Sequence, residues 1–163
     1  MLYFAYGSNM STPRLSDRVS GLSKIGIGKL CGHALEYHKV SKDGSAKCDI
    51  VISEVDDSIV IGIVFLFPDN QLVKLNEAEG YGKGYDSKYV AISLANGSEL
   101  EALTYFATNI DKGLKPYHWY KHHVVYGAQE NGLPDWYIER LKAVESVDDP
   151  DFAREAKQMN LYR

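Results

Sequence analysis

The stretch Ile59–Phe67, which reads IVIGIVFLF, restricts the fold of this chain more than any other feature. Its β-branched and aromatic residues favour a strand, and the absence of alternating polar residues indicates a strand buried on both faces or a barrel stave. Pro68 ends the strand, because proline has no N–H to donate to a sheet. The chain therefore needs a sheet that is covered on both sides or closed on itself.

The remaining pattern is one of strands first and helices last. Residues 25–37 (IGIGKLCGHALEY) contain three glycines, which predicts a single bent or bulged strand of the kind found where a sheet closes on itself. Further strands are predicted over 50–53, 89–94 and 102–107, the last two forming a hairpin. Helices are predicted from 69 or 70 to 79 and over 118–125, 134–144 and 152–161. This order indicates an α+β domain.

Length and charge restrict the function. The 163 residues, 45% hydrophobic and 25% charged, fit a single domain spanning 1–163. Eighteen basic and 22 acidic residues give a net charge of −4 without a basic run, so we expect no nucleic-acid partner. No apolar run is long enough to cross a membrane, and nothing resembles a signal peptide. We therefore expect a cytoplasmic protein without a membrane partner; the oligomeric state stays open.

The two cysteines suggest neither a disulfide framework nor a zinc site. Cys31 and Cys48 have no metal-ligand or redox spacing, so reduced thiols in a cytoplasm fit best. We expect Cys31, in apolar surroundings, to be buried, and we expect no preference for Cys48.

The opening stretch Leu2–Met10, LYFAYGSNM, is a candidate ligand loop. Its apolar half predicts a buried strand, which Gly7, Ser8 and Asn9 stop in a sharp turn. Gly7 allows φ values closed to other residues, and Ser8 and Asn9 can hydrogen-bond nearby backbone, so the turn can present several N–H groups to one small anionic or carbonyl-bearing ligand. The alternative interpretation is that the loop binds no ligand, because a strand followed by such a turn and a helix is common in proteins without a ligand there.

Glu79 is the candidate acid/base residue. It ends a predicted helix directly before the glycine-rich segment GYGKGYD, at the edge of a loop. The helix dipole disfavours a carboxylate at a C-terminus, which would raise the pKa of Glu79 towards that of a general base working near neutrality. A solvated glutamate at a helix end is the alternative, and Glu77 is by position an equally good candidate.

Other possible sites are weaker. His118 and His122 have the i, i+4 spacing of a metal pair but lack the intervening glutamate of the zinc-protease motif, so we expect no metal site. Ser8 is a conceivable nucleophile, yet no G-x-S-x-G elbow surrounds it.

Three segments together are similar to the γ-glutamylcyclotransferase-like family. They are YFAYGSNM at 3–10, LNEAEG at 75–80 and YKHHVVYGAQENGLPDWYIERLKAV at 120–144. Their order and rough spacing match the family over almost the whole chain. The resemblance implies a small closed or nearly closed mixed β-barrel with flanking helices. It also implies an enzyme, independent of metals and other cofactors, that cyclises a γ-glutamyl amino acid or amine to 5-oxoproline.

The resemblance also implies roles for individual residues. Four residues correspond to those that hold the glutamyl portion of the substrate: Tyr6, Gly7, Ser8 and Asn9. Glu79 corresponds to the general acid/base, whereas Glu77 corresponds to no functional position. Tyr120 and Tyr89 fall where tyrosines line the pocket, with a purely structural role as the alternative for both.

Two departures from the family pattern leave the leaving group open. CDIVIS at 48–53 replaces a strand rich in glycine and alanine, and GYGKGYDSK at 80–88 is longer and richer in glycine than the family suggests. A protein that binds a small carboxylate metabolite without catalysis is the main alternative function. An enzyme acting on γ-glutamyl amines, including ε-lysyl conjugates, is another.

Overall fold

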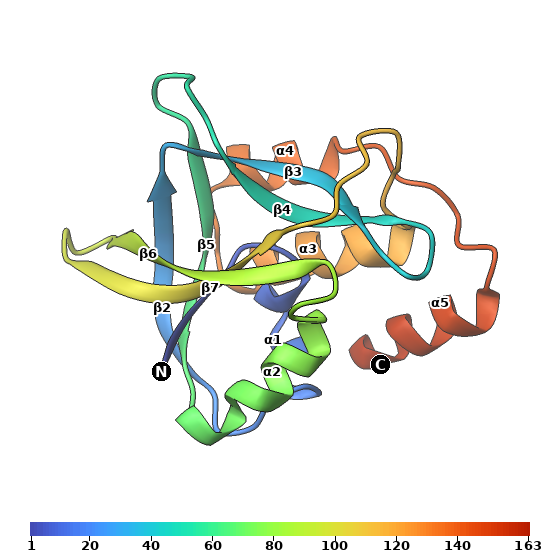
Figure 1. Ribbon diagram of the computed structural model, residues 1–163, viewed down its shortest axis with the longest axis horizontal. Helices are drawn as coiled ribbons and strands as arrows, with labels where there is room; N and C mark the ends of the chain where they lie inside the picture. Colours follow the sequence, from blue (N-terminus) through green and yellow to red (C-terminus); the bar gives the residue numbers. More distant parts are fainter.

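The computed structural model describes all residues from 1 to 163 and contains a closed five-stranded barrel. The strands follow one another around the barrel in the order β1-β5-β2-β6-β7. Their bounds are Leu2–Ala5 for β1, Ser23–Cys31 for β2, Ile59–Leu66 for β5, Tyr85–Leu94 for β6 and Glu99–Ala107 for β7. The buried stave predicted at 59–67 is therefore correct: β5 lies between β1 and β2 and pairs with both (Figure 1).

Glycines and one parallel contact close the barrel. β1 runs antiparallel to β5 and pairs in parallel with β7 at Tyr3 and Leu103. A Cβ at Gly28 of β2 would lie 2.5 Å from Ile92, and one at Gly62 of β5 would lie 2.3 Å from a backbone oxygen. Only glycine fits these two positions, which is why the strands approach closely enough to form a small barrel.

A second sheet of two strands, β3 (His33–Val40) and β4 (Ala46–Ile52), crosses α3 and α4 in the view of Figure 1. The prediction of one bent strand over 25–37 is wrong, because these residues belong to two strands, β2 and β3, in different sheets. Gly32 has φ 68°, a left-handed conformation that ends β2 and starts β3. The predicted irregularity is present, since the pairing of β2 with β5 shifts between Lys24 and Gly26.

Five α-helices surround the two sheets. They are α1 Thr12–Ser16, α2 Leu72–Glu79, α3 His118–Glu130, α4 Asp135–Lys142 and α5 Phe152–Met159. Short 3₁₀ turns cover Ser8–Met10, Asp69–Gln71 and Asn160–Tyr162. Helix α3 packs directly on the segment after β1, because a Cβ at Gly127 would lie 2.3 Å from the Ser11 nitrogen. None of the helices is long and apolar enough to span a membrane.

Candidate active site

The loop after β1 is shaped by close packing. Gly7 has φ −116°, so the loop does not use the positive φ values that glycine allows. A side chain would nevertheless be crowded, because a Cβ would lie 3.0 Å from the Cβ of Cys48 on β4 and 3.4 Å from the Tyr120 hydroxyl. Gly7 therefore lets the loop lie directly against β4 and α3.

The same loop carries hydrogen-bond donors that the protein does not use. Ser8 and Asn9 are buried, at 8% and 4% exposure, and begin a single 3₁₀ turn. The first N–H groups of a helical turn have no acceptor inside it, and those of Gly7, Ser8 and Asn9 donate to no other protein group. The Ser8 hydroxyl is also without a partner. Several donors are thus available to a ligand.

Glu79 faces this loop from the end of α2. Gly80 has φ 69° and ends the helix as a left-handed cap, and the side chain of Glu79 just before it is 13% exposed. Asn9 Nδ2 donates to Glu79 Oε1 at 2.8 Å, joining residues 70 positions apart in the chain. Oε2 accepts no hydrogen bond from the protein. Glu77 points into solvent two residues earlier.

Arg18 is a residue of this site that the sequence did not indicate. Its Nη1 donates to Glu79 Oε1 at 2.5 Å and to Asn9 Oδ1 at 2.9 Å. The Asn9 amide also donates to the Tyr3 hydroxyl at 3.0 Å. The guanidinium therefore places a positive charge next to a carboxylate that the helix dipole disfavours. Its two hydrogen bonds also hold Asn9 and Glu79 in fixed positions relative to each other. Arg18 lies in no motif, so only the fold could reveal it.

These side chains surround a narrow cavity. The volume open to the centre of a water-sized sphere is about 20 Å³. Ten residues line the cavity: Tyr3, Tyr6, Gly7, Ser8, Asn9, Cys48, Glu79, Tyr85, Tyr105 and Tyr120. All the predicted site residues are among them except one. The loop that carries the free donors and the Glu79 carboxylate thus line the same half-open cavity.

Tyrosine hydroxyls hold the walls of the cavity in place. Tyr85 donates to the Cys48 carbonyl at 2.5 Å, Tyr120 accepts from the Cys48 N–H at 2.9 Å, and Tyr6 donates to the Tyr105 carbonyl at 2.6 Å. Burial raises the pKa of Tyr6, Tyr85 and Tyr120 well above the ordinary value. These hydroxyls therefore stay protonated and serve as donors or neutral acceptors.

Tyr89 is the predicted site residue that the structure does not bring to the cavity. Its side chain is 58% exposed on β6, while Tyr85, four residues earlier on the same strand, lines the cavity. The two tyrosines lie on the same side of the strand, since side chains alternate with period two. The Tyr85 hydroxyl donates to the Cys48 carbonyl of β4, whereas Tyr89 is mostly exposed. The alternation along the strand therefore does not identify the pocket residue, and packing by β4 does.

The two cysteines lie in different environments, and the expectation that Cys31 is buried is wrong. Cys31 is exposed, and Cys48 is 1% exposed beneath the loop. Burial raises the pKa of the Cys48 thiol to about 12, which keeps it protonated and unreactive. Cys31 is exposed because it is the last residue of β2, whereas β4 turns Cys48 towards α3.

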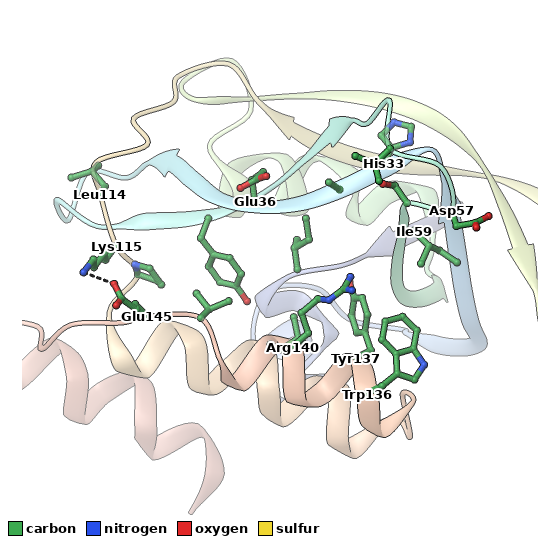
Figure 2. A pocket seen from close by; sticks show the side chains of 18 of the residues that line it. His33, Glu36, Asp57, Ile59, Leu114, Lys115, Trp136, Tyr137, Arg140 and Glu145 are labelled. Carbon is green, nitrogen blue, oxygen red and sulfur yellow. Dashed lines mark ion pairs between the residues drawn. The ribbon is translucent and has the colours of Figure 1, made fainter.

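A larger cavity of about 540 Å³ lies elsewhere, between β3 and α4. Figure 2 shows Trp136 and Arg140 rising from α4 towards the strand that carries His33 and Glu36. Its walls are mostly apolar, and the Glu145 carboxylate at one end pairs with Lys115 at 2.6 Å. Nothing there matches the row of unused N–H groups opposite Glu79, so size alone does not identify the candidate active site.

Comparisons with known proteins agree with this geometry. Residues 59–141 match the AIG2-like family. Human gamma-glutamylcyclotransferase is 32% identical over 152 residues, which cover 90% of this chain and 80% of the human protein. A solved gamma-glutamyl cyclotransferase superposes with a TM-score of 0.86 at 29% identity, covering 98% of each chain. An uncharacterised human protein superposes with a TM-score of 0.82 at 32% identity, covering 90% of this chain and 89% of that one.

Proposed function

Because the chain belongs to the AIG2-like family and to that of the γ-glutamylcyclotransferases, we propose that it cyclises the γ-glutamyl group of a small substrate to 5-oxoproline and releases an amino acid or amine. The observation that carries this proposal is the position of the Glu79 carboxylate opposite the unused donors of the Gly7–Asn9 turn. A γ-glutamyl group presents an ammonium, a carboxylate and a carbonyl oxygen, which match one free acceptor and several free donors.

Binding folds the substrate for attack on itself. The N–H groups of the turn and the Ser8 hydroxyl receive the α-carboxylate and the γ-carbonyl oxygen, and the α-ammonium lies at Glu79 Oε2. Holding the nitrogen close to the γ-carbonyl carbon makes the reaction intramolecular, which removes much of its entropic cost.

Glu79 then moves protons within the substrate. It takes one proton from the α-ammonium, and the free amine attacks the γ-carbonyl carbon, forming the ring C–N bond. The negative charge that develops on oxygen is stabilised by the N–H groups of the turn. Glu79 returns its proton to the departing nitrogen as the old C–N bond breaks. A second proton passes from the ring nitrogen to the released amine, so the reaction is balanced without any co-reactant.

A carboxylate binder without catalysis is the less favoured function. The negative charge of Glu79 in the cavity opposes the binding of a carboxylate. Asn9 and Arg18 nevertheless hold Glu79 there by hydrogen bonds. We further propose a cytoplasmic protein with a small-molecule substrate and no nucleic-acid partner. The exposed, unpaired thiol of Cys31 fits a reducing compartment.

The Glu79→Gln variant tests this assignment. It preserves size and hydrogen bonding but cannot accept the proton, so the release of 5-oxoproline from γ-glutamyl-alanine should fall about 10³-fold, within the range of acid/base catalysis. The measurement is the initial rate of 5-oxoproline formation at saturating substrate.

Glu77→Gln is the matched control, because this exposed carboxylate lies on the same helix two residues away. Its rate should remain at the wild-type level. Wild-type activity in Glu79→Gln, or a large loss in Glu77→Gln instead, would show that the wrong carboxylate has been assigned.

A further inference from the structure

Lys39 on β3 is a nearly buried cation without a partner. The residue is 8% exposed, and its ammonium makes no ion pair and no hydrogen bond within the protein. Its neighbour across the hairpin, Lys47, differs in this respect, since Lys47 Nζ donates to Asp43 Oδ2 at 2.7 Å and to the Ser45 hydroxyl at 2.6 Å. The Lys39 side chain is therefore mostly buried while its charge has no protein partner, and a cation held in this way favours an anionic partner.

The carboxylates that face Lys39 are already occupied. Asp43 is paired with Lys47, and Glu79 with Arg18. Burial lowers the pKa of Lys39, and the negative charges of Glu79 and Asp43 only partly oppose this. Lys39 thus lies within electrostatic range of the candidate base but is not neutralised by it. A partner from outside the protein would complete the arrangement.

Lys39 also lies against the wall of the catalytic cavity. Its Nζ is 4.6 Å from the centre of the Tyr85 ring, and Tyr85 lines the same cavity as Glu79. On the other side, a Cβ at Gly84 would lie 3.1 Å from Nζ. Gly84 belongs to the glycine-rich segment that follows Glu79, so the lack of a side chain there leaves room around the ammonium.

We propose, on the basis of the proposed function, that Lys39 binds a carboxylate on the leaving group of the substrate and thereby determines which γ-glutamyl compounds are cleaved. In a γ-glutamyl α-amino acid, the carboxylate is separated from the scissile nitrogen by one carbon. A γ-glutamyl amine has no such carboxylate, and a conjugate through the ε-amine of lysine carries it several carbons away. Lys39 therefore selects leaving groups whose carboxylate lies next to the bond that breaks.

Two substrates that differ only in this carboxylate test the proposal: γ-glutamyl-alanine and γ-glutamyl-ethylamide. Lys39→Met keeps the length and apolar stem of the side chain but removes its charge. We expect kcat/KM for γ-glutamyl-alanine to fall 10- to 100-fold, the range for a hydrogen bond between charged groups. For γ-glutamyl-ethylamide we expect a change of less than twofold, which also verifies that the variant is folded.

Two further variants serve as controls. Lys42→Met removes an exposed charge from the same hairpin and should leave both substrates unaffected. Lys39→Arg keeps the positive charge and should retain most of the preference for γ-glutamyl-alanine.

The possible results are distinct. An equal loss on both substrates would assign Lys39 to the glutamyl half or to the fold and would overturn the proposal, as would the absence of any loss. If the wild-type protein releases 5-oxoproline from neither compound, the proposed function itself fails, and the role of Lys39 fails with it.

Discussion

Arg14 and Arg18 lie four residues apart after the opening loop, yet they enter two clusters of different kinds. Arg18 contacts Asn9 and Glu79 at the edge of a cavity. Arg14 is buried, and its Nη1 lies 3.2 Å from His123 Nε2 on α3 and donates to the Gln158 side chain of α5 at 2.6 Å. We refer to these as the Arg18 cluster (Asn9, Arg18, Glu79) and the Arg14 cluster (Arg14, His123, Gln158, Tyr162).

The difference lies in what each cluster leaves unused. In the Arg14 cluster the partners of the arginine are neutral, and burial lowers the pKa of Arg14 to about 10 and that of His123 to about 3. These groups connect α1 and α3 to the C-terminal helix. The Arg18 cluster instead contains a carboxylate with one free oxygen, next to a row of free N–H groups. A buried polar network is therefore a structural feature in the first case and a candidate catalytic one in the second.

Acid should weaken the Arg14 cluster first. His123 stays neutral in the folded protein, chiefly through burial and then through the Arg14 charge, whereas the unfolded chain takes up a proton below its ordinary pKa of 6.5. The contribution of neutral His123 to the free energy of unfolding is therefore fully present above pH 6.5 and is lost as the pH falls towards 3. At 1.36 kcal/mol per pH unit, about 2 kcal/mol should be lost between pH 6.5 and 5.

Urea unfolding over this pH range measures the loss. His123→Gln removes the titrating group and should flatten the dependence, whereas the matched change His118→Gln, at a half-exposed position on the same helix, should leave it as it is. A full dependence in His123→Gln would assign the acid sensitivity to another group.

The Arg18 cluster should respond in catalysis. Arg18 holds Glu79 and Asn9 through two hydrogen bonds, so Arg18→Met should lower kcat about tenfold while KM changes less than twofold, because positioning of the base and not substrate binding is lost. Arg18→Lys should restore part of the rate. Steady-state kinetics with γ-glutamyl-alanine separate the two constants.

Arg14→Met is the matched control for this variant. Arg14 belongs to the same segment but forms no hydrogen bond or ion pair with a residue of the cavity, so kcat of the Arg14→Met variant should stay within about twofold of the wild type. If the two variants lose equal activity, the distinction between the clusters does not hold.

The sequence predicted local features of the fold well. The stave at 59–67, the hairpin of the strands at 89–94 and 102–107, and the helix end at Glu79 each depend on residues close together in the chain, and the structure confirms all three. The sequence did not predict the strand break at Gly32, nor the features that depend on which elements pack together. Gly32 divides one predicted strand into two, and Tyr85 replaces Tyr89 at the cavity because β4 covers one and not the other.

The site was predictable to a similar degree. The opening loop and Glu79 each carry a local signal, and their resemblance to a known family connects them. Arg18 carries no such signal, because its role arises only when α2 brings Glu79 to the segment after the loop. Lys39 is of the same kind: a lysine on a strand is ordinary until the fold buries it beside Tyr85 without an acid.

The smallest effect is expected where the chain ends against the Arg14 cluster. The Tyr162 hydroxyl contacts the Ser11 hydroxyl at 3.0 Å and also His123 Nδ1. Tyr162→Phe removes these hydrogen bonds and should lower the free energy of unfolding by about 1 kcal/mol. Activity should not change, since the cluster lies outside the cavity. Tyr126→Phe is the control: its ring lies 4.3 Å from that of Tyr162, but its hydroxyl bonds to no protein group. A loss of turnover in Tyr162→Phe at unchanged stability would couple the C-terminal helix to the loop and merge the two clusters into one functional unit.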